Sequence, residues 1–474
     1  MVFSSIVFLL YFLPAFLLLY YLSPQKFKNP VILISSIFFY SWGAPQFIFV
    51  ILLTTFVDFH LVKWMSESKS EMKRRALLVL SVSVNLGLLF YFKYSNFFID
   101  NLNNALSLIG INQVAWTKLL LPIGISFYTF ETITYVVDVF RKVHKPLKHF
   151  WDYQLYIILF PKLIAGPIIR YHDLADQITD RSANENIDNR LTGFYRFVIG
   201  LAKKVLIANQ MGLVADSAFS SDISMLNSSS AWIAILAYTI QIYFDFSGYS
   251  DMAIGLGKMM GFRFPENFHN PYTSKSITEF WRRWHITLGS WMRNYLYIPL
   301  GGNKVDTKRR LYFNLWLVFL LSGLWHGSSW NFVLWGAYHG SFLVFERIFL
   351  LKVYEKIGNF LSTLLTFFIV VIGWVFFRVE NISDAFVFLE KMFVFDFRYR
   401  AEWDPEFVFF FILAIFFSFF TSIKQGQTIQ DKIYIGQYTI SRHLSMAFLS
   451  FLLLILSISS ITSFGFNPFI YFRF

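Results

Sequence analysis

One histidine in an apolar stretch is the residue of this sequence best placed to do chemistry. His326 lies in the segment Ser322–Asn331, 15 residues after the apolar run that begins at Leu311. A continuous helix would carry it about 22 Å from the basic loop 304–310, inside a hydrocarbon core about 30 Å thick. An imidazole at that depth is a structural group, a metal or haem ligand, or a general base, and a desolvated ring keeps the neutral form that a base requires. No second histidine follows three or four residues away, which argues against a metal pair.

A second histidine lies in a short run of aromatic and basic residues. His285 ends the sequence Phe280-Trp-Arg-Arg-Trp-His285 and precedes His326 by 41 residues. Arg282 and Arg283 suit the binding of an anionic phosphate at the cytoplasmic interface. The alternative is that both arginines anchor an amphipathic helix to anionic lipid. The mixture of aromatic and basic residues over 280–300 favours an interfacial helix over a spanning one.

Two aspartates lie in a third apolar run. The segment Tyr243–Gly255 contains Asp245 and Asp251 together with two serines and two glycines. A charge at the centre of a membrane helix costs roughly 2.5–3.5 kcal/mol on insertion scales, so these acids need a reason to be there. The composition favours an unwound segment that lines a cavity, or acids that pair with lysines such as Lys203 or Lys204. The sequence leaves both interpretations open.

The overall composition requires that membrane helices position these residues. Of the 474 residues, 56% are apolar and 15% are charged, whereas soluble domains average about 45–50% and about 25%. We therefore expect an all-α polytopic membrane protein with one integral-membrane domain over residues 1–474. The chain contains no cysteine, which excludes disulfides, thiolate metal sites and a cysteine thioester.

Charge sets the expected orientation of the helices. The net charge of +12 arises from basic residues that cluster in short loops such as 63–75 and 141–148, while the loop 95–117 has no lysine or arginine. Basic loops face the cytoplasm in membrane proteins. We therefore place these basic loops inside and the N-terminus outside. The positive-inside rule explains the surplus of basic residues without nucleic-acid binding.

Apolar runs predict roughly 11 crossings, with re-entrant and interfacial segments in the middle third. The run 153–169 is short and interrupted by prolines and a glycine, which favours a re-entrant segment. The helical hairpin 30–62 breaks at 43–45, and the glycines of 255–261 favour close helix packing. The other expected helices are 3–22, 76–92, 119–137, 194–214, 232–261, 311–325, 329–345, 360–377, 407–420 and 444–461.

Several of these motifs, in this order, resemble the membrane-bound O-acyltransferase family. They are Trp281–His285, Trp325–Gly327, Asp245–Tyr249 and Phe160–Pro167. The similarity extends over essentially the whole chain and is strongest to the bacterial branch that acts in alginate, peptidoglycan and cellulose O-acetylation. The ending Phe464–Phe474 also resembles that branch.

The resemblance implies a ring of helices around a central tunnel in the bacterial inner membrane. It implies that His326 is catalytic and that His285 is the second polar catalytic residue. The expected substrate-binding residues are Arg282, Arg283, Asp245, Tyr249, Asp251 and Trp325, with no metal.

The resemblance also implies the substrates and partners. The donor would be acetyl-CoA or an acylated carrier, with no tightly bound cofactor. The partner would be an extracytoplasmic SGNH-like acetyltransferase or a polysaccharide assembly complex, in contact with membrane lipid and without nucleic acid. Three alternatives remain: D-alanyl transfer to teichoic acid, a transporter of polysaccharide precursors, and a non-catalytic scaffold of a secretion complex.

Overall fold

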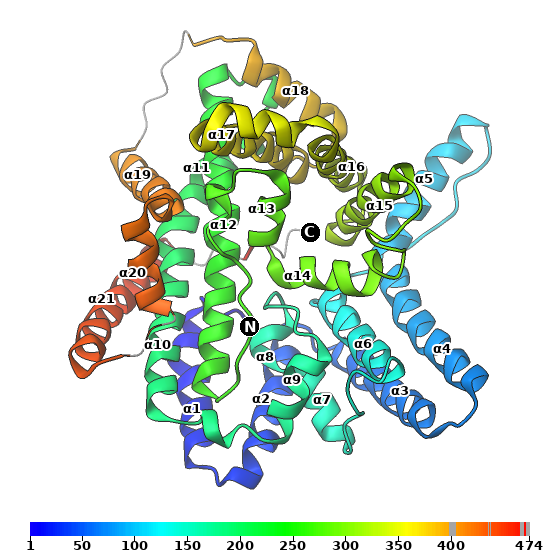
Figure 1. The fold of residues 1–474 in the computed structure, drawn as a ribbon. Helices are drawn as coiled ribbons and strands as arrows, with labels where there is room; N and C mark the ends of the chain where they lie inside the picture. Colours follow the sequence, from blue (N-terminus) through cyan, green and yellow to red (C-terminus); the bar gives the residue numbers. More distant parts are fainter. Residues whose placement is uncertain (398–403, 435, 437, 465–468, 471–474) are drawn as a thin grey trace. The chain divides into compact units, whose positions relative to one another are not determined.

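The computed structural model describes residues 1–397, 404–434, 436, 438–464 and 469–470, and this part of the chain consists of helices and loops without a strand (Figure 1). The chain divides into two compact units. Unit 1 comprises Met1–Asn186 and Met260–Phe264, and unit 2 comprises Ile187–Met259 and Pro265–Phe474. The expected all-α class is confirmed. The single domain over residues 1–474 stays a prediction.

Unit 1 is formed by the N-terminal helices. They are α1 (Leu13–Leu22), α2 (Gln25–Gly43), α3 (Ile48–Glu67), α4 (Glu71–Leu89), α5 (Ser95–Leu108), α6 (Ile125–Phe140), α7 (Phe150–Ile158), α8 (Phe160–Leu163) and α9 (Tyr171–Thr179). Helix α3 packs against α4, α6 and α7, and α9 packs against α6 and α7. The expected break at 43–45 is confirmed, because α2 ends at Gly43 and α3 begins at Ile48.

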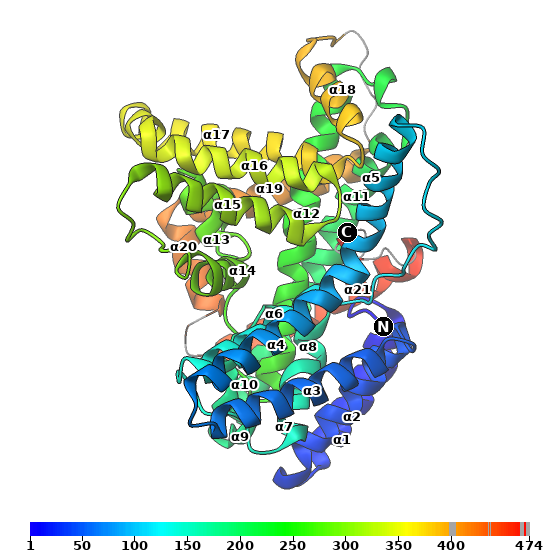
Figure 2. The same ribbon diagram turned by 90° about the vertical axis from the view of Figure 1, so that its right-hand side faces the viewer.

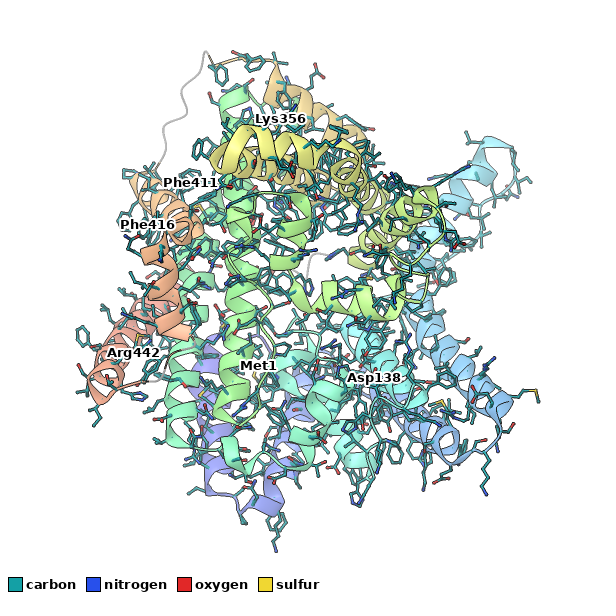
Figure 3. All side chains as sticks on the ribbon, viewed as in Figure 1. Met1, Asp138, Lys356, Phe411, Phe416 and Arg442 are labelled. Atoms are coloured by element: carbon teal, nitrogen blue, oxygen red, sulfur yellow. The ribbon has the colours of Figure 1, made fainter. Side chains whose placement is uncertain are left out.

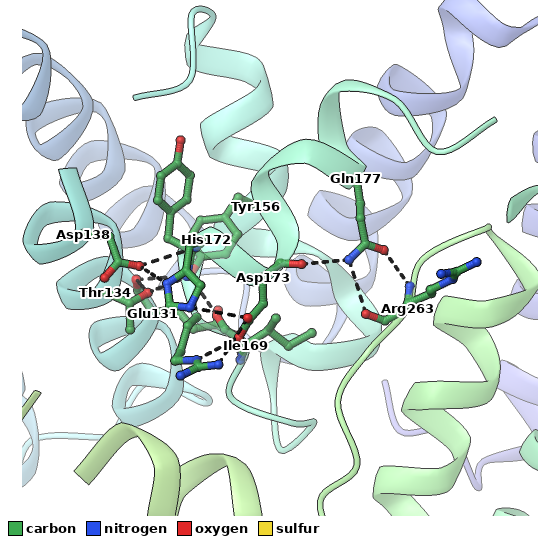
Figure 4. A network of polar contacts seen from close by, with 11 residues as sticks. Glu131, Thr134, Asp138, Tyr156, Ile169, His172, Asp173, Gln177 and Arg263 are labelled. Carbon is green, nitrogen blue, oxygen red and sulfur yellow. Dashed lines mark hydrogen bonds and ion pairs between the residues drawn. The ribbon is translucent and has the colours of Figure 1, made fainter. Parts of the chain in front are cut away.

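A buried polar network stabilises the core of unit 1 between α6 and the interrupted segment 153–169 (Figure 4). Lys162 on α8 forms an ion pair with Glu131 on α6, and both side chains are almost fully buried. The Tyr156 hydroxyl donates to the carbonyl of Ile169 at 2.8 Å. These partners compensate the interruption between α7 and α8, where backbone hydrogen bonds end. The re-entrant path of this segment in the membrane stays a prediction.

The segment Met260–Phe264 reaches unit 1 after the chain has passed through three helices of unit 2. The carbonyl of Met260 accepts hydrogen bonds from Tyr20 at 2.8 Å and from Arg181 at 2.9 Å. The backbone N–H of Arg263 donates to the side chain of Gln177 at 2.7 Å, a contact drawn in Figure 4. Unit 1 is therefore assembled from two stretches that are distant in sequence.

Unit 2 holds the remaining helices. They are α10 (Ile187–Ala202), α11 (Asn209–Ser220), α12 (Ser228–Met259), α13 (Ile277–Arg283), α14 (Ile286–Trp291), α15 (Lys308–His326), α16 (Trp330–Phe345), α17 (Leu351–Arg378), α18 (Ile382–Phe393), α19 (Pro405–Phe419), α20 (Lys424–Tyr434) and α21 (Ile440–Phe464). Figure 2 shows α15, α16 and α17 side by side, and α16 contacts both of its neighbours.

Glycines let α10 and α12 approach closely in unit 2. A Cβ atom on Gly200 would lie 2.5 Å from the carbonyl oxygen of Gly248, and one on Gly255 would lie 2.6 Å from that of Gly193. Real side chains do not tolerate such distances, so the crossing depends on glycine at these positions. Close helix packing in the stretch 255–261 is therefore confirmed for Gly255, whereas Gly261 lies beyond the end of α12.

The described residues contain six helical stretches long and apolar enough to cross a membrane. They are Ile48–Glu67, Glu71–Leu108, Ile187–Ser220, Trp330–Arg378, Pro405–Ser422 and Ile440–Ser463. Figure 3 shows aromatic side chains such as Phe411 and Phe416 on α19, and Phe416 is 59% exposed. Outward-facing Phe on an apolar helix suits contact with lipid. The count of roughly 11 crossings stays a prediction.

Three sequence-based expectations about local structure are wrong. Helix α5 occupies the first half of the predicted loop 95–117. The segment 243–255 is not unwound but lies inside the long helix α12, because its acids have partners. The segment 280–300 is not one interfacial helix. It contains the end of α13, all of α14 and a π-helical stretch at 292–297.

Candidate active site

A cavity of about 500 Å³ in unit 2 is the candidate active site. It lies among α13, α14, α15 and the end of α16. The polar residues around it include His285, His326, Arg282, Arg293, Arg347 and Ser322. The cavity thus brings together both histidines expected to be catalytic and one of the two arginines of the motif Trp281–His285.

His326 is the last residue of α15 and is fixed by aromatic rings. Its side chain packs edge-on against Trp325, Trp335 and Phe377, with ring centroids 5.0, 5.1 and 5.3 Å away. The residue is 6% exposed. Helix α16 can approach this part of α15 because Gly336 lies against the backbone of α15. The imidazole is therefore held by packing on three sides and borders the cavity.

His285 lies at the break between α13 and α14, outside the six candidate spans. Its backbone has φ 46° and ψ 53°, a left-handed conformation that is uncommon for residues other than glycine. Its Nδ1 lies 3.1 Å from Oδ1 of Asn267, and Phe246 packs edge-on against the ring at 4.7 Å. Burial lowers the pKa of His285 to about 3, so the ring is neutral at physiological pH.

The two imidazoles are neighbours. Their ring centroids lie 6.5 Å apart, although His285 and His326 come from different helical segments. Two closely spaced histidines at a cavity can accept a proton from one substrate group and hydrogen-bond another. The arrangement is suited to proton transfer during group transfer between two bound molecules.

Three arginines give the cavity a basic wall. Arg282 comes from α13, Arg293 follows α14, and Arg347 follows α16. Guanidinium groups suit phosphate recognition because they offer several donors in a fixed plane. Arg347 was not among the substrate-binding residues predicted from the sequence. The available signal was an arginine within the long apolar stretch Trp330–Arg378, where a charge marks a functional position.

Two other predicted binding residues lie beside the cavity lining rather than in it. Arg283 forms an ion pair with Glu279 at 2.6 Å and donates to the hydroxyl of Thr273 at 3.1 Å. Trp325 is 4% exposed and packs against His326. Both residues therefore support neighbours of the cavity.

The predicted binding residues of α12 also have structural partners. Asp245 lies 2.7 Å from the ammonium group of Lys204 and accepts a hydrogen bond from the backbone of Ile470, also at 2.7 Å. Tyr249 stacks on Phe469, with ring centroids 4.6 Å apart. Of the ending Phe464–Phe474, the positions 465–468 and 471–474 lie outside the described residues.

Asp251 pairs with one basic side chain of α10 and one of the π-helical stretch 203–208 that follows it. It lies 2.8 Å from Arg196 and 2.6 Å from Lys203. This ion-pair cluster borders a second cavity of about 130 Å³. The pairing of the α12 acids with lysines, one of the two interpretations of the sequence, is what the structure contains. Among the described residues, no group of three or more histidine or acidic side chains is arranged to hold a metal ion.

Long apolar helices and two neighbouring imidazoles at an arginine-lined cavity define an integral-membrane protein equipped for group transfer. The chain belongs to the membrane-bound O-acyltransferase family, whose model matches residues 34–360. The matched region contains both His285 and His326.

Similarity to individual proteins supports the assignment to this family. A probable alginate O-acetylase AlgI of Pseudomonas aeruginosa is 46% identical over 398 residues, which cover 83% of this chain and 75% of the relative. A peptidoglycan O-acetyltransferase of Helicobacter pylori is 35% identical over 425 residues, covering 83% and 80%. A teichoic acid D-alanyltransferase of Bacillus subtilis is 28% identical over 237 residues, covering 48% and 59%. The chain is a membrane O-acyltransferase.

Proposed function

We propose that this enzyme transfers an acetyl group from a cytoplasmic donor towards a hydroxyl of an extracytoplasmic polysaccharide. The acceptor is the polymer itself or a partner acetyltransferase outside the membrane. The observation that carries the proposal is the pair His285 and His326 at one cavity, with ring centroids 6.5 Å apart. The similarity to an alginate O-acetylase and to a peptidoglycan O-acetyltransferase supports acetyl as the group transferred.

In the proposed reaction His326 is the general base. Its imidazole takes the proton of the acceptor hydroxyl while the hydroxyl oxygen attacks the carbonyl carbon of a thioester. The carbon–sulfur bond then breaks, and the leaving thiolate takes the proton from the imidazolium. Proton transfer by a positioned side chain contributes roughly 10²–10⁴-fold to such reactions. Holding both substrates at one cavity lowers the entropic cost of bringing them together.

The three arginines of the cavity, called the arginine wall, indicate that the donor is anionic. Acetyl-CoA and an acylated carrier both present phosphate groups, which Arg282, Arg293 and Arg347 are suited to bind. Under this proposal the basic loops lie on the cytoplasmic side of a bacterial inner membrane. An SGNH-like acetyltransferase or a polysaccharide assembly complex is the proposed partner on the opposite side.

Substitution of His326 tests the proposal. His326→Ala and His326→Gln should each lower acetylation of the cell-envelope polysaccharide by about 10²–10⁴-fold, because neither side chain serves as the base. His149→Ala is the matched control, since His149 is exposed and lies in unit 1. Acetyl groups released from the polymer are measured by mass spectrometry, and the amount of folded enzyme by gel filtration in detergent. Full acetylation by a folded His326 variant would refute the role of this residue.

D-alanyl transfer is the second candidate, and the similarity to a teichoic acid D-alanyltransferase favours it. The same mass measurement separates the two reactions, because an acetyl and a D-alanyl ester differ in the mass released. Loss of D-alanyl esters with unchanged acetylation in cells without this enzyme would overturn acetyl transfer and support the second candidate.

A further inference from the structure

Residues 285–287 are held by one asparagine. The side-chain oxygen of Asn267 lies 3.1 Å from Nδ1 of His285 and accepts a hydrogen bond from the hydroxyl of Thr287 at 2.9 Å. It also accepts from the backbone N–H of Thr287 at 3.3 Å, and the backbone carbonyl of Asn267 accepts from Ile286 at 2.9 Å. Asn267 is fully buried. Its side chain and its backbone therefore both contact the segment that contains His285.

These contacts fix the orientation of the Asn267 amide. A backbone N–H only donates, so the atom that faces the N–H of Thr287 must be the amide oxygen. On its other side, the amide nitrogen donates to the hydroxyl of Ser250 at 3.0 Å. The amide oxygen of Asn267, which can only accept hydrogen bonds, therefore faces His285.

The proton of His285 follows from this orientation. An acceptor at 3.1 Å from Nδ1 requires that Nδ1 carries the hydrogen. In a neutral ring Nε2 then keeps its lone pair and is the nitrogen that can accept a proton or a hydrogen bond. His285 lines the cavity of about 500 Å³, whereas Asn267 lines the second cavity of about 130 Å³.

The backbone conformation of His285 also depends on Asn267. The left-handed conformation of His285 is unfavourable for a residue with a side chain and persists only where the surroundings determine it. Asn267 supplies those surroundings through its contacts with Ile286 and Thr287. A hydrogen bond to one ring nitrogen of a histidine determines which nitrogen carries the proton.

We propose that Asn267 is a positioning residue that holds His285 with its proton on Nδ1, so that Nε2 serves as the acceptor towards substrate in the cavity. The substrate group that it fits is a hydroxyl or an amide N–H. This inference rests on the proposed function only for the catalytic use of His285. The tautomer itself is a property of the resting protein.

The test measures both the tautomer of His285 and the transfer activity of the enzyme. Nitrogen-15 NMR of protein labelled at histidine distinguishes Nδ1–H from Nε2–H, and the spectrum of His285→Gln identifies the signal of His285 among the nine histidines. We expect the Nδ1–H form in the unmodified enzyme. Asn267→Leu has a similar volume without the acceptor, and it should shift His285 towards Nε2–H and lower transfer about tenfold. Ser250→Ala is the control, since it removes a partner of the amide nitrogen and should leave the tautomer unchanged.

The outcomes distinguish a failure of the positioning inference from a failure of the proposed function. An Nε2–H signal in the unmodified enzyme would overturn the inference, even if Asn267→Leu does not fold. An unchanged Nδ1–H signal in folded Asn267→Leu would also overturn it. If His285→Gln keeps full transfer activity while Asn267 still determines the tautomer, the catalytic role of His285 in the proposed function fails and the positioning inference stands.

Discussion

The crossing of α10 and α12 makes a sharp prediction for the stability of unit 2. Gly200 faces the backbone of α12, and a Cβ atom there would lie 2.5 Å from the carbonyl oxygen of Gly248 and 2.7 Å from the backbone nitrogen of Met252. Backbone atoms cannot move aside as a flexible side chain can. Gly200→Ala must therefore push the two helices apart.

The expected cost follows from these distances. Overpacking of a tightly packed contact typically destabilises by about 1–3 kcal/mol, and two backbone clashes place Gly200→Ala in that range. The better helix propensity of alanine offsets roughly 0.5–1 kcal/mol of this cost. The ion pair between Lys203 and Asp251 lies close to the crossing and would be strained by the same displacement.

Gly87→Ala is the matched control for this prediction. Gly87 lies inside α4, and a Cβ atom there meets nothing within 4 Å. We expect Gly87→Ala to be as stable as the unmodified enzyme or slightly more stable, and Gly200→Ala to unfold at a lower temperature. Thermal unfolding in detergent, followed by the monodisperse fraction on gel filtration, measures both. Equal stability of the two variants would refute the close crossing.

Two further predictions concern charged residues. Lys204→Met should destabilise the enzyme by about 3–5 kcal/mol because it removes the cation beside buried Asp245, and the double variant Lys204→Met/Asp245→Leu should recover most of the loss in the same unfolding assay. Arg282→Gln and Arg347→Gln should each raise the KM for an anionic donor by roughly 10–100-fold, since charge-assisted hydrogen bonds contribute about 1.5–3 kcal/mol, while exposed Arg309→Gln should not. An unchanged KM in both cavity variants would contradict donor binding at the arginine wall.

Features governed by local composition could be predicted from the sequence. Runs of apolar residues gave the long helices, and the turn residues at 43–45 gave the end of α2. The adjacency of His326 to tryptophan and glycine was visible as well, because those neighbours are close in the chain. The sequence-based assignment of both histidines to one site rested on the family resemblance, and their placement at one cavity agrees with it.

Features governed by distant partners could not be predicted in the same way. The acids of α12 allowed two interpretations, an unwound segment or pairing with lysines, and the sequence could not decide between them. In the structure Lys203 and Lys204 pair with the acids and the helix continues. The break at His285 depends on hydrogen bonds to Asn267, which lies 18 residues away along the chain. Arg347 reaches the cavity only because α16 packs against α15. Such contacts have no periodic signal in a single sequence.

The divided composition of unit 1 has a consequence for biogenesis. Tyr20 and Arg181 leave the ribosome before Met260, whose carbonyl they bind, has been synthesised. At about 5–20 residues per second, translation of residues 187–259 takes several seconds, and during this time Tyr20 and Arg181 lack this partner. During that interval α10, α11 and α12 are synthesised, so an arrest of translation before Met260 would leave the first nine helices incomplete as well.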